Sequence, residues 1–248
     1  MKISYMSDLH FEFSEIMPDQ AEARLPGGDV LVLAGDIAPI KGIVAGRYKN
    51  LPKFLEIAAN KYRKIYAVAG NHELYGATIG RETLDALHRF YDGLGVTFLD
   101  GASDTFEGVK FFGGTFWTDM NNADPEVMAL GPRYMNDYRV ISGLTPEAQI
   151  ELHRWCVEAM KNASPDVVIS HHAPGIGSID SRFRHEGLAN FLYYSDIQIP
   201  ESVKFWIHGH VHCRVAYRKD GCQVRANPRG YPAETKHNGF DFGATIEI

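Results

Sequence analysis

The chain has 248 residues, of which 45% are hydrophobic and 23% are charged, and its formal net charge is −6. These values are typical of a soluble globular protein, and the absence of a Lys/Arg block argues against nucleic acid as the main partner. Three scattered cysteines exclude a disulfide framework. Neither a signal peptide nor an apolar run of about 20 residues is present, so we expect a cytoplasmic protein without membrane association.

Short apolar runs that end in polar or glycine residues predict β-strands along the chain. Several runs are apolar enough to be buried on both faces, as in a parallel sheet. In chain order, the predicted strands are Lys2–Ser7, Asp29–Ala34, Lys64–Ala69, Val109–Trp117, Asp166–Ser170 and Val203–His208.

Amphipathic patterns between these strands predict three helices. They cover Leu51–Arg63, Arg81–Leu94 and Leu144–Ala163. The last has a clear start, with Thr145 as N-cap and Pro146 at the first helical position. The order of strands and helices in the first hundred residues favours crossover connections and a largely parallel sheet.

The C-terminal third has a different pattern. Cys213–Arg218 and Cys222–Ala226 flank Lys219-Asp220-Gly221, which predicts a β-hairpin, and Gly243–Ile248 alternates like a closing strand. We find no repeat and no evident linker, so the sequence predicts an α/β protein with a single domain over residues 1–248.

Two long segments, Met120–Tyr138 and Gly175–Asp196, are polar and rich in Gly, Asn, Asp and aromatic residues. We expect irregular loops there, serving either as substrate loops or as plain surface. The three tryptophans Trp117, Trp155 and Trp206 lie in or beside apolar runs, and we expect them in the core.

Five of the predicted strands are followed by residues that commonly bind metals. Each fragment alone could be an ordinary turn, but chance is a poor explanation for all five occurring in order. Strand ends of an α/β sheet converge at one edge, where ligands bind. The residues are Asp8 and His10, Asp36, Asn71 and His72, His171 and His172, and His210 and His212.

Mixed oxygen and nitrogen donors without cysteine suit metals such as Mn, Fe or Zn. A carboxylate can bridge two cations, and Asp36 is the candidate. Two metals about 3.5–4 Å apart can share a hydroxide and stabilise an in-line displacement at phosphorus. His72 follows Asn71 directly and is therefore placed to protonate the leaving oxygen.

The motifs resemble those of the calcineurin-like metallophosphoesterases, from residue 8 to residue 212. The resemblance implies two packed mixed β-sheets flanked by helices in four layers, with a dinuclear site at the strand ends. It assigns the first metal to Asp8, His10, Asp36 and His212. It assigns the second metal to the bridging Asp36, Asn71, His171 and His210.

Adjacent strand residues point in opposite directions, so only one of His171 and His172 should face the metal. The family pattern favours His171, and His172 then either contacts substrate or packs. The Asp and Arg residues that accompany these motifs in the phosphoprotein phosphatases are absent, which disfavours a protein phosphatase. The tail around Arg229 resembles a bacterial subgroup of predicted phosphohydrolases, and Arg229 either reaches a phosphate or forms a structural turn.

The leading hypothesis is therefore hydrolysis of a small or nucleotide-like phosphomonoester or phosphodiester. A metal-bridging hydroxide would attack in line, and His72 would assist the leaving group. Two alternatives remain open: a scaffold or binding protein with weak catalysis, and a nuclease acting on DNA ends. The sequence indicates neither the natural ester, nor which pair of Mn, Fe or Zn ions is used, nor the oligomeric state.

Overall fold

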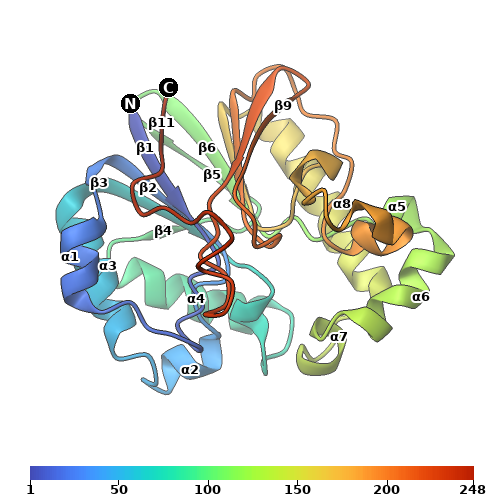
Figure 1. Ribbon diagram of the computed structural model, residues 1–248, viewed down its shortest axis with the longest axis horizontal. Coiled ribbons are helices and arrows are strands. Elements are labelled where there is room, and N and C mark those ends of the chain that lie inside the picture. Colours follow the sequence, from blue (N-terminus) through green and yellow to red (C-terminus); the bar gives the residue numbers. More distant parts are fainter.

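The computed structural model describes residues 1–248 and contains two mixed β-sheets (Figure 1). The first sheet has the strand order β11-β1-β2-β3-β4, in which the first four strands of the chain are parallel and β11 is antiparallel to β1. Its strands are β1 (Lys2–Met6), β2 (Gly28–Ala34), β3 (Tyr62–Val68), β4 (Thr97–Phe98) and β11 (Thr245–Glu247).

The second sheet has the order β5-β6-β7-β8-β10-β9. Its four central strands are parallel, and β5 and β9 close its edges in antiparallel pairings. The strands are β5 (Ala102–Phe106), β6 (Val109–Gly114), β7 (Val167–Ser170), β8 (Phe205–His208), β9 (Val215–Lys219) and β10 (Cys222–Ala226). The predicted hairpin is β9–β10, and its turn residues Asp220 and Gly221 have the positive φ values, 51° and 82°, that a tight hairpin turn needs.

Alternating side chains of each central strand fill different apolar layers. In β2, Val30 and Val32 pack in a cluster between the sheets, whereas Leu31 and Leu33 pack under the N-terminal helices. In β8, Ile207 faces the other sheet and Trp206 faces the opposite way. Three apolar layers therefore hold four structural layers together, as the sequence predicted.

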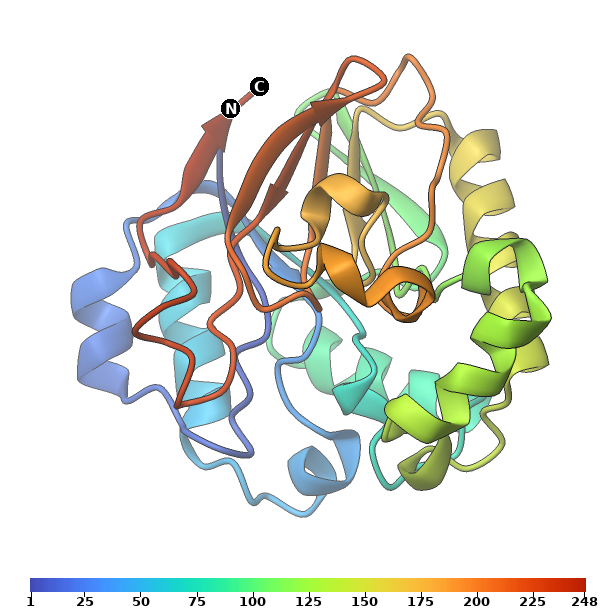
Figure 2. The ribbon, with the colours of Figure 1, turned by 45° about the vertical axis from the view of Figure 1, so that its right-hand side comes forward.

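Helices cover the outer face of each sheet (Figures 1 and 2). The first sheet carries α1 (Pro18–Arg24), α2 (Ile40–Val44), α3 (Asn50–Lys61) and α4 (Arg81–Asp92) on its side of the molecule. The second is covered by α8 (Pro146–Ala163), which begins as predicted, since Thr145 Oγ1 accepts a hydrogen bond from Ala148 N at 3.1 Å. None of the helices combines the length and the apolar character needed to cross a membrane.

Several expectations from sequence were wrong. Residues 120–138 are mostly helical, with α5 (Met120–Ala123), α6 (Pro125–Tyr134) and α7 (Asp137–Val140), and α5 is a left-handed turn in which all four residues have positive φ. Residues 175–196 contain two 3₁₀ segments, η2 (Ile176–Ser178) and η3 (Arg184–Leu192). Trp155 is 49% exposed rather than part of the core, because α8 buries a different face and the indole lies against Gly101.

Candidate metal centre

Both sheets contribute to one cluster of polar side chains at the carboxyl ends of their parallel strands. Two loops after strands of the first sheet are especially short, placing Asp8 two residues after β1 and Asp36 two residues after β2. His171 follows β7 directly, in the second sheet. The remaining members come from the ends of the same set of strands: His10 after β1, Asn71 and His72 after β3, and His210 and His212 after β8.

The backbone of these turns is left-handed at most of the predicted ligand positions. Side chains other than glycine rarely adopt positive φ, and such strained residues gather at functional sites. The affected residues, with φ between 46° and 69°, are Asp8, His10, Asp36, His210 and His212. The ends of β1, β2 and β8 thus each turn sharply at the residues that carry the donor atoms.

The glycines of the motifs make room for the ligands. A Cβ atom at Gly209 would lie 2.6 Å from Asp8 Oδ2, and one at Gly70 would collide with Asp36 Oδ1. Glycine precedes a ligand at these positions because a side chain would occupy the place of a carboxylate from a neighbouring strand.

Glu73 fixes the turns that carry Asp36 and Asn71. Its buried carboxylate accepts hydrogen bonds from the backbone N–H groups of Asp36, Ile37 and Gly70, at 2.9, 2.6 and 2.7 Å. The end of β2 and the end of β3 are therefore tied to a single buried side chain.

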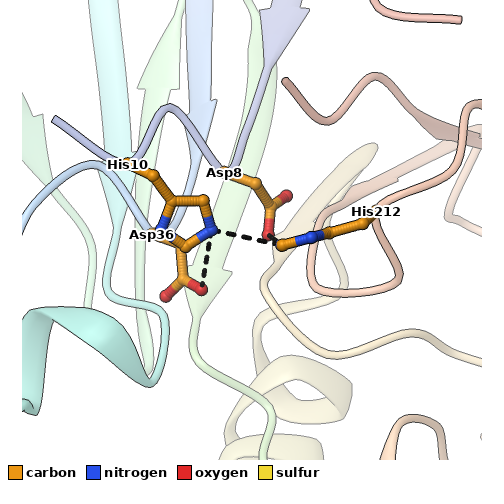
Figure 3. Close-up of side chains that lie close together, drawn as sticks. All are labelled: Asp8, His10, Asp36 and His212. Carbon is orange, nitrogen blue, oxygen red and sulfur yellow. Dashed lines mark hydrogen bonds and ion pairs between the residues drawn. The ribbon is translucent and has the colours of Figure 1, made fainter. Parts of the chain in front are cut away.

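The first group of donors is shown in Figure 3. Its donor atoms all lie within 4.8 Å of one another, and its members are Asp8, His10, Asp36 and His212. His212 Nε2 lies 3.2 Å from Asp8 Oδ1, and His10 Nε2 lies 3.9 Å from Asp36 Oδ2 (Figure 3). The Nε2 atoms of the two imidazoles are only 3.1 Å apart.

The second group shares Asp36 with the first. Asp36, His171 and His210 form a second set of donors within 4.8 Å, and Asn71 joins them because its Oδ1 lies 3.0 Å from His171 Nε2. Asp36 Oδ1 accepts a hydrogen bond from the backbone N–H of His72 at 2.8 Å, and Asp36 Oδ2 lies 3.3 Å from His171 Nε2. This carboxylate stands between the two groups, where it can bridge two cations.

Carboxylates hold the imidazoles of the first group so that Nε2 faces the cluster. His10 Nδ1 donates to Glu12 Oε1 at 2.9 Å, and His212 Nδ1 donates to Glu234 Oε2 at 2.7 Å. A neutral ring with its proton on Nδ1 turns the lone pair of Nε2 inward. Two lone pairs that face each other across 3.1 Å repel unless a cation or proton lies between them, so this donor set fits a metal ion.

The second group of donors also fits a metal ion. His210 Nε2 is buried and has no hydrogen-bond partner, which is costly in a protein interior unless the atom binds an ion. Asn71 Nδ2 donates to Asp137 Oδ1 at 2.9 Å, which turns Asn71 Oδ1 toward His171. Both features leave donors free for a cation.

The charges of the cluster favour ionised carboxylates. Burial raises the pKa of Asp36, but the imidazoles of His171 and His72 lower it by more than burial raises it. The pKa of Asp36 therefore lies well below the ordinary value. Burial likewise opposes protonation of His171, yet Asp36 raises its pKa to about 9. In His212, hydrogen bonds to Asp8 and Glu234 outweigh burial and raise the pKa to about 10. Without metal, protons neutralise this site.

His72 lies beside the donor groups and is held on three sides. Its Nδ1 donates to Glu12 Oε1 at 2.8 Å, its ring stacks on Tyr75 at 4.0 Å, and its Nε2 lies 3.3 Å from the hydroxyl of Tyr231. Burial lowers the pKa of His72, but Asp36 and Glu12 raise it more, so its pKa lies above the ordinary value. Glu12 accepts from His72 and from His10 through the same oxygen.

His172 and Arg229, for which substrate binding was one of two open roles, make contacts within the protein. His172 is buried, its Nδ1 lies 3.3 Å from the carbonyl oxygen of Thr115, and its ring packs on His210 at 4.2 Å. The Arg229 guanidinium donates to the carbonyl oxygens of Leu9 and Ser14. These contacts favour the packing role for His172 and the structural role for Arg229.

The residues that orient the predicted ligands were not foreseen from the sequence. Glu12 carried a usable signal, because it lies two positions after His10 in the same turn. Asp137 and Glu234 carried none, because each lies in a polar segment far along the chain from its partner. All three are carboxylates that each accept a hydrogen bond from a predicted ligand.

Comparison with known proteins agrees with this geometry. A family model described as calcineurin-like phosphoesterase matches residues 1–214. The chain belongs to the calcineurin-like phosphoesterase family. Among curated proteins of similar sequence, an uncharacterised protein, L509, of Acanthamoeba polyphaga mimivirus is 23% identical over 282 residues, which cover 99% of this chain and 96% of L509.

Solved structures show the same fold. A phosphopantetheinyl hydrolase from Mycobacterium tuberculosis aligns with a TM-score of 0.68 at 18% identity, over 99% of this chain and 95% of that one. A dimetal phosphatase from Danio rerio aligns with a TM-score of 0.50 at 16% identity, over 91% and 86% of the two chains. The calcineurin-like phosphoesterase fold, with its paired sheets, is therefore shared across distant sequences.

Proposed function

We propose that this protein hydrolyses phosphoesters in a metal-dependent reaction at the two donor groups. Membership of the calcineurin-like phosphoesterase family supports this class of reaction in general. The observation that carries the proposal for this chain is the pair of buried donor groups that share Asp36. The first ion would be held by Asp8, His10, Asp36 and His212, and the second by Asp36, Asn71, His171 and His210.

When bound, two such cations supply an activated water for in-line attack and offset the charge on the phosphoryl oxygens. The donor types suit Mn, Fe or Zn. His72 Nε2 faces the same cleft as Asp36 and His210, which supports its role as the acid that protonates the leaving oxygen. Glu12 accepts the hydrogen bond from His72 Nδ1 and so keeps Nε2 directed at the substrate.

A small phosphoester is the proposed substrate. No Lys or Arg side chain lines the cleft beside the donor groups, whereas grooves that bind nucleic acid are rich in such residues. This lining counts against the alternative of a DNA-end nuclease. The complete donor set and the retained His72 count against a catalytically weak scaffold.

The test is hydrolysis of chromogenic monoesters and diesters by the purified protein with Mn²⁺, Zn²⁺ or Fe²⁺, together with its metal content. A phosphopantetheine diester belongs in the panel because one protein of this fold is named for that activity. Asp36→Asn should lower bound metal to less than two ions per chain and abolish turnover, whereas Asp85→Asn, at an exposed position on α4, should change neither. Full activity of Asp36→Asn, or no turnover with any metal, would contradict the proposal.

A further inference from the structure

A cleft of about 410 Å³ opens onto the two donor groups and His72. Its far walls come from the α6–α7 segment, from the η3 segment and from residues around Tyr231. Helix α6 and η3 lie side by side in both views (Figures 1 and 2) and share an apolar cluster. The volume exceeds what a phosphoryl group alone would fill, so the walls must contact the organic part of a substrate.

The walls of the cleft carry carboxylates but neither lysine nor arginine, and their only basic side chains are His72, His210 and His212 at the metal site. None of the 19 residues that line the cleft is Lys or Arg. Five are carboxylates: Asp36, Asp137, Asp180, Glu186 and Glu234. Asp180 is paired with Arg182 at 2.7 Å, but Arg182 itself does not line the cleft, and Glu186 is exposed without an ion pair.

Any anionic group of a substrate that lies away from the metal site would therefore find no Lys or Arg in the cleft to pair with, and on the η3 wall it would face the unpaired carboxylate of Glu186. Like charges within the cleft repel each other, and solvent and salt screen this repulsion only in part. A nucleoside polyphosphate brings several such charges outside the phosphoryl group that reacts. A phosphodiester brings a single negative charge, which the metal site can meet.

Aromatic side chains line the same walls. Of the eight exposed large hydrophobic residues of the protein, three line this cleft, namely Tyr134, Phe183 and Tyr231. Tyr75 and Tyr193 add two further rings. Such walls favour a planar or apolar group, and rings beside carboxylates also favour a cation.

We propose that this cleft selects phosphodiesters whose retained arm is an uncharged or cationic, ring-bearing or apolar group, and that it discriminates against anionic arms. The inference rests on the proposed function. In the reaction, a water oxygen bonds to phosphorus as the bond to the leaving oxygen breaks. The two protons of that water end on the released alcohol, by way of His72, and on the phosphomonoester that keeps the retained arm.

The test uses diesters with one leaving group, 4-nitrophenolate, and three aryl retained arms that differ in charge: neutral 4-tert-butylphenyl, anionic 4-carboxyphenyl and cationic 4-(trimethylammonio)phenyl. The metal-loaded protein should show a kcat/KM for the anionic arm about threefold to tenfold below that for the neutral arm. The cationic arm should be hydrolysed at least as well as the neutral one. The monoester 4-nitrophenyl phosphate should be hydrolysed less well, because it has no retained arm to contact the aromatic walls. Equal or faster hydrolysis of the anionic arm overturns the inference while leaving the proposed function intact. Turnover of none of the esters overturns both.

Two variants locate the effect. Glu186→Lys places a cation in the wall and should raise kcat/KM for the anionic arm toward that for the neutral arm. Glu158→Lys makes the same charge change on α8, outside the cleft, and should leave the ratio unchanged. Equal effects of the two variants would mean that overall charge, rather than the cleft, sets the preference.

Discussion

Glu12 is the residue whose replacement best separates the predicted roles within the metal centre. Its Oε1 accepts from His10 Nδ1 at 2.9 Å and from His72 Nδ1 at 2.8 Å, and its Oε2 is buried without a partner. Glu12→Gln keeps the shape of the side chain and leaves one oxygen to accept both bonds. It removes the negative charge that both imidazoles face.

The size of the effect follows from these two hydrogen bonds. A hydrogen bond to a charged group contributes about 1.5–3 kcal/mol and a neutral one about 1 kcal/mol, so each bond weakens by about 1 kcal/mol. An ester whose leaving oxygen needs a proton depends on both imidazoles, and it should lose about 2 kcal/mol, or about thirtyfold in kcat/KM. An ester that releases 4-nitrophenolate needs no proton from His72. Its kcat/KM should therefore fall only by the effect of the weakened hydrogen bond from His10, about 1 kcal/mol or about fivefold.

The assay is kcat/KM at saturating metal for a series of diesters with one retained arm and leaving groups of increasing basicity. Glu12→Gln should steepen the dependence of the rate on leaving-group pKa. Glu234→Gln is the matched control, because the Glu234 side chain accepts from the ligand His212 and not from His72. It should lower metal affinity and all rates by a similar factor.

Parallel rate losses in the two variants, with unchanged leaving-group dependence, would refute this reasoning. Glu12 would then act on the metal site alone, and the proton would reach the leaving oxygen from another group. Tyr231, whose hydroxyl lies 3.3 Å from His72 Nε2, would be the next residue to replace.

Three further predictions follow from the same contacts. Glu73→Ala should lower the free energy of unfolding of the metal-free protein by at least about 3 kcal/mol in urea, because three buried N–H groups lose their acceptor; an unchanged midpoint would contradict this. The pKa values of His171 and His212 in the metal-free protein are about 9 and about 10, above the ordinary 6.5. The protonated imidazoles therefore stabilise the folded metal-free protein fully below about pH 6.5, and this stabilisation is lost as the pH rises through 9 to 10. Metal binding at pH 7 should accordingly release about two protons, measured by calorimetry in buffers of different ionisation enthalpy, and release of none would refute the assignment. Arg229→Ala should reduce stability without changing KM, whereas a higher KM at unchanged stability would show that Arg229 binds substrate.

The parallel strands could be predicted because they are strongly apolar and most end at a polar motif, whereas the packing of two sheets in layers was expected only from the family resemblance. The helices at Arg81 and Pro146 were also clear, since their apolar faces repeat regularly. Strands β4 and β5 were not foreseen: β4 has only two residues and β5 is largely exposed, so neither carries an apolar pattern. Helix α6 was not foreseen because residues 120–138 are polar and rich in Gly, Asn and Asp. Pro132, a residue type that usually ends a helix, lies inside α6.

The candidate site could be predicted only as a set of residue types at strand ends. The left-handed backbone at Asp8 or Asp36 could not be predicted, because aspartate adopts that conformation more often than most residues but still only in a minority of positions. The link from Glu12 to His72 joins residues 60 positions apart, and a single sequence contains no information about that pairing. The side chains that orient metal ligands through hydrogen bonds are thus the part of a site that is hardest to predict from a single sequence.

Strand β1 lies in the interior of its sheet, between β2 and β11, although its two neighbours are separated by more than two hundred residues of chain. During synthesis β1 therefore keeps one unpaired edge until residues 245–247 arrive, and such edges are prone to associate with other chains. The donors Asp8 and His212 are nearly as far apart in sequence, so the first cation can be captured only after the second sheet has docked. In the proposed function, loading of the first site with metal would for this reason follow the docking of the two sheets.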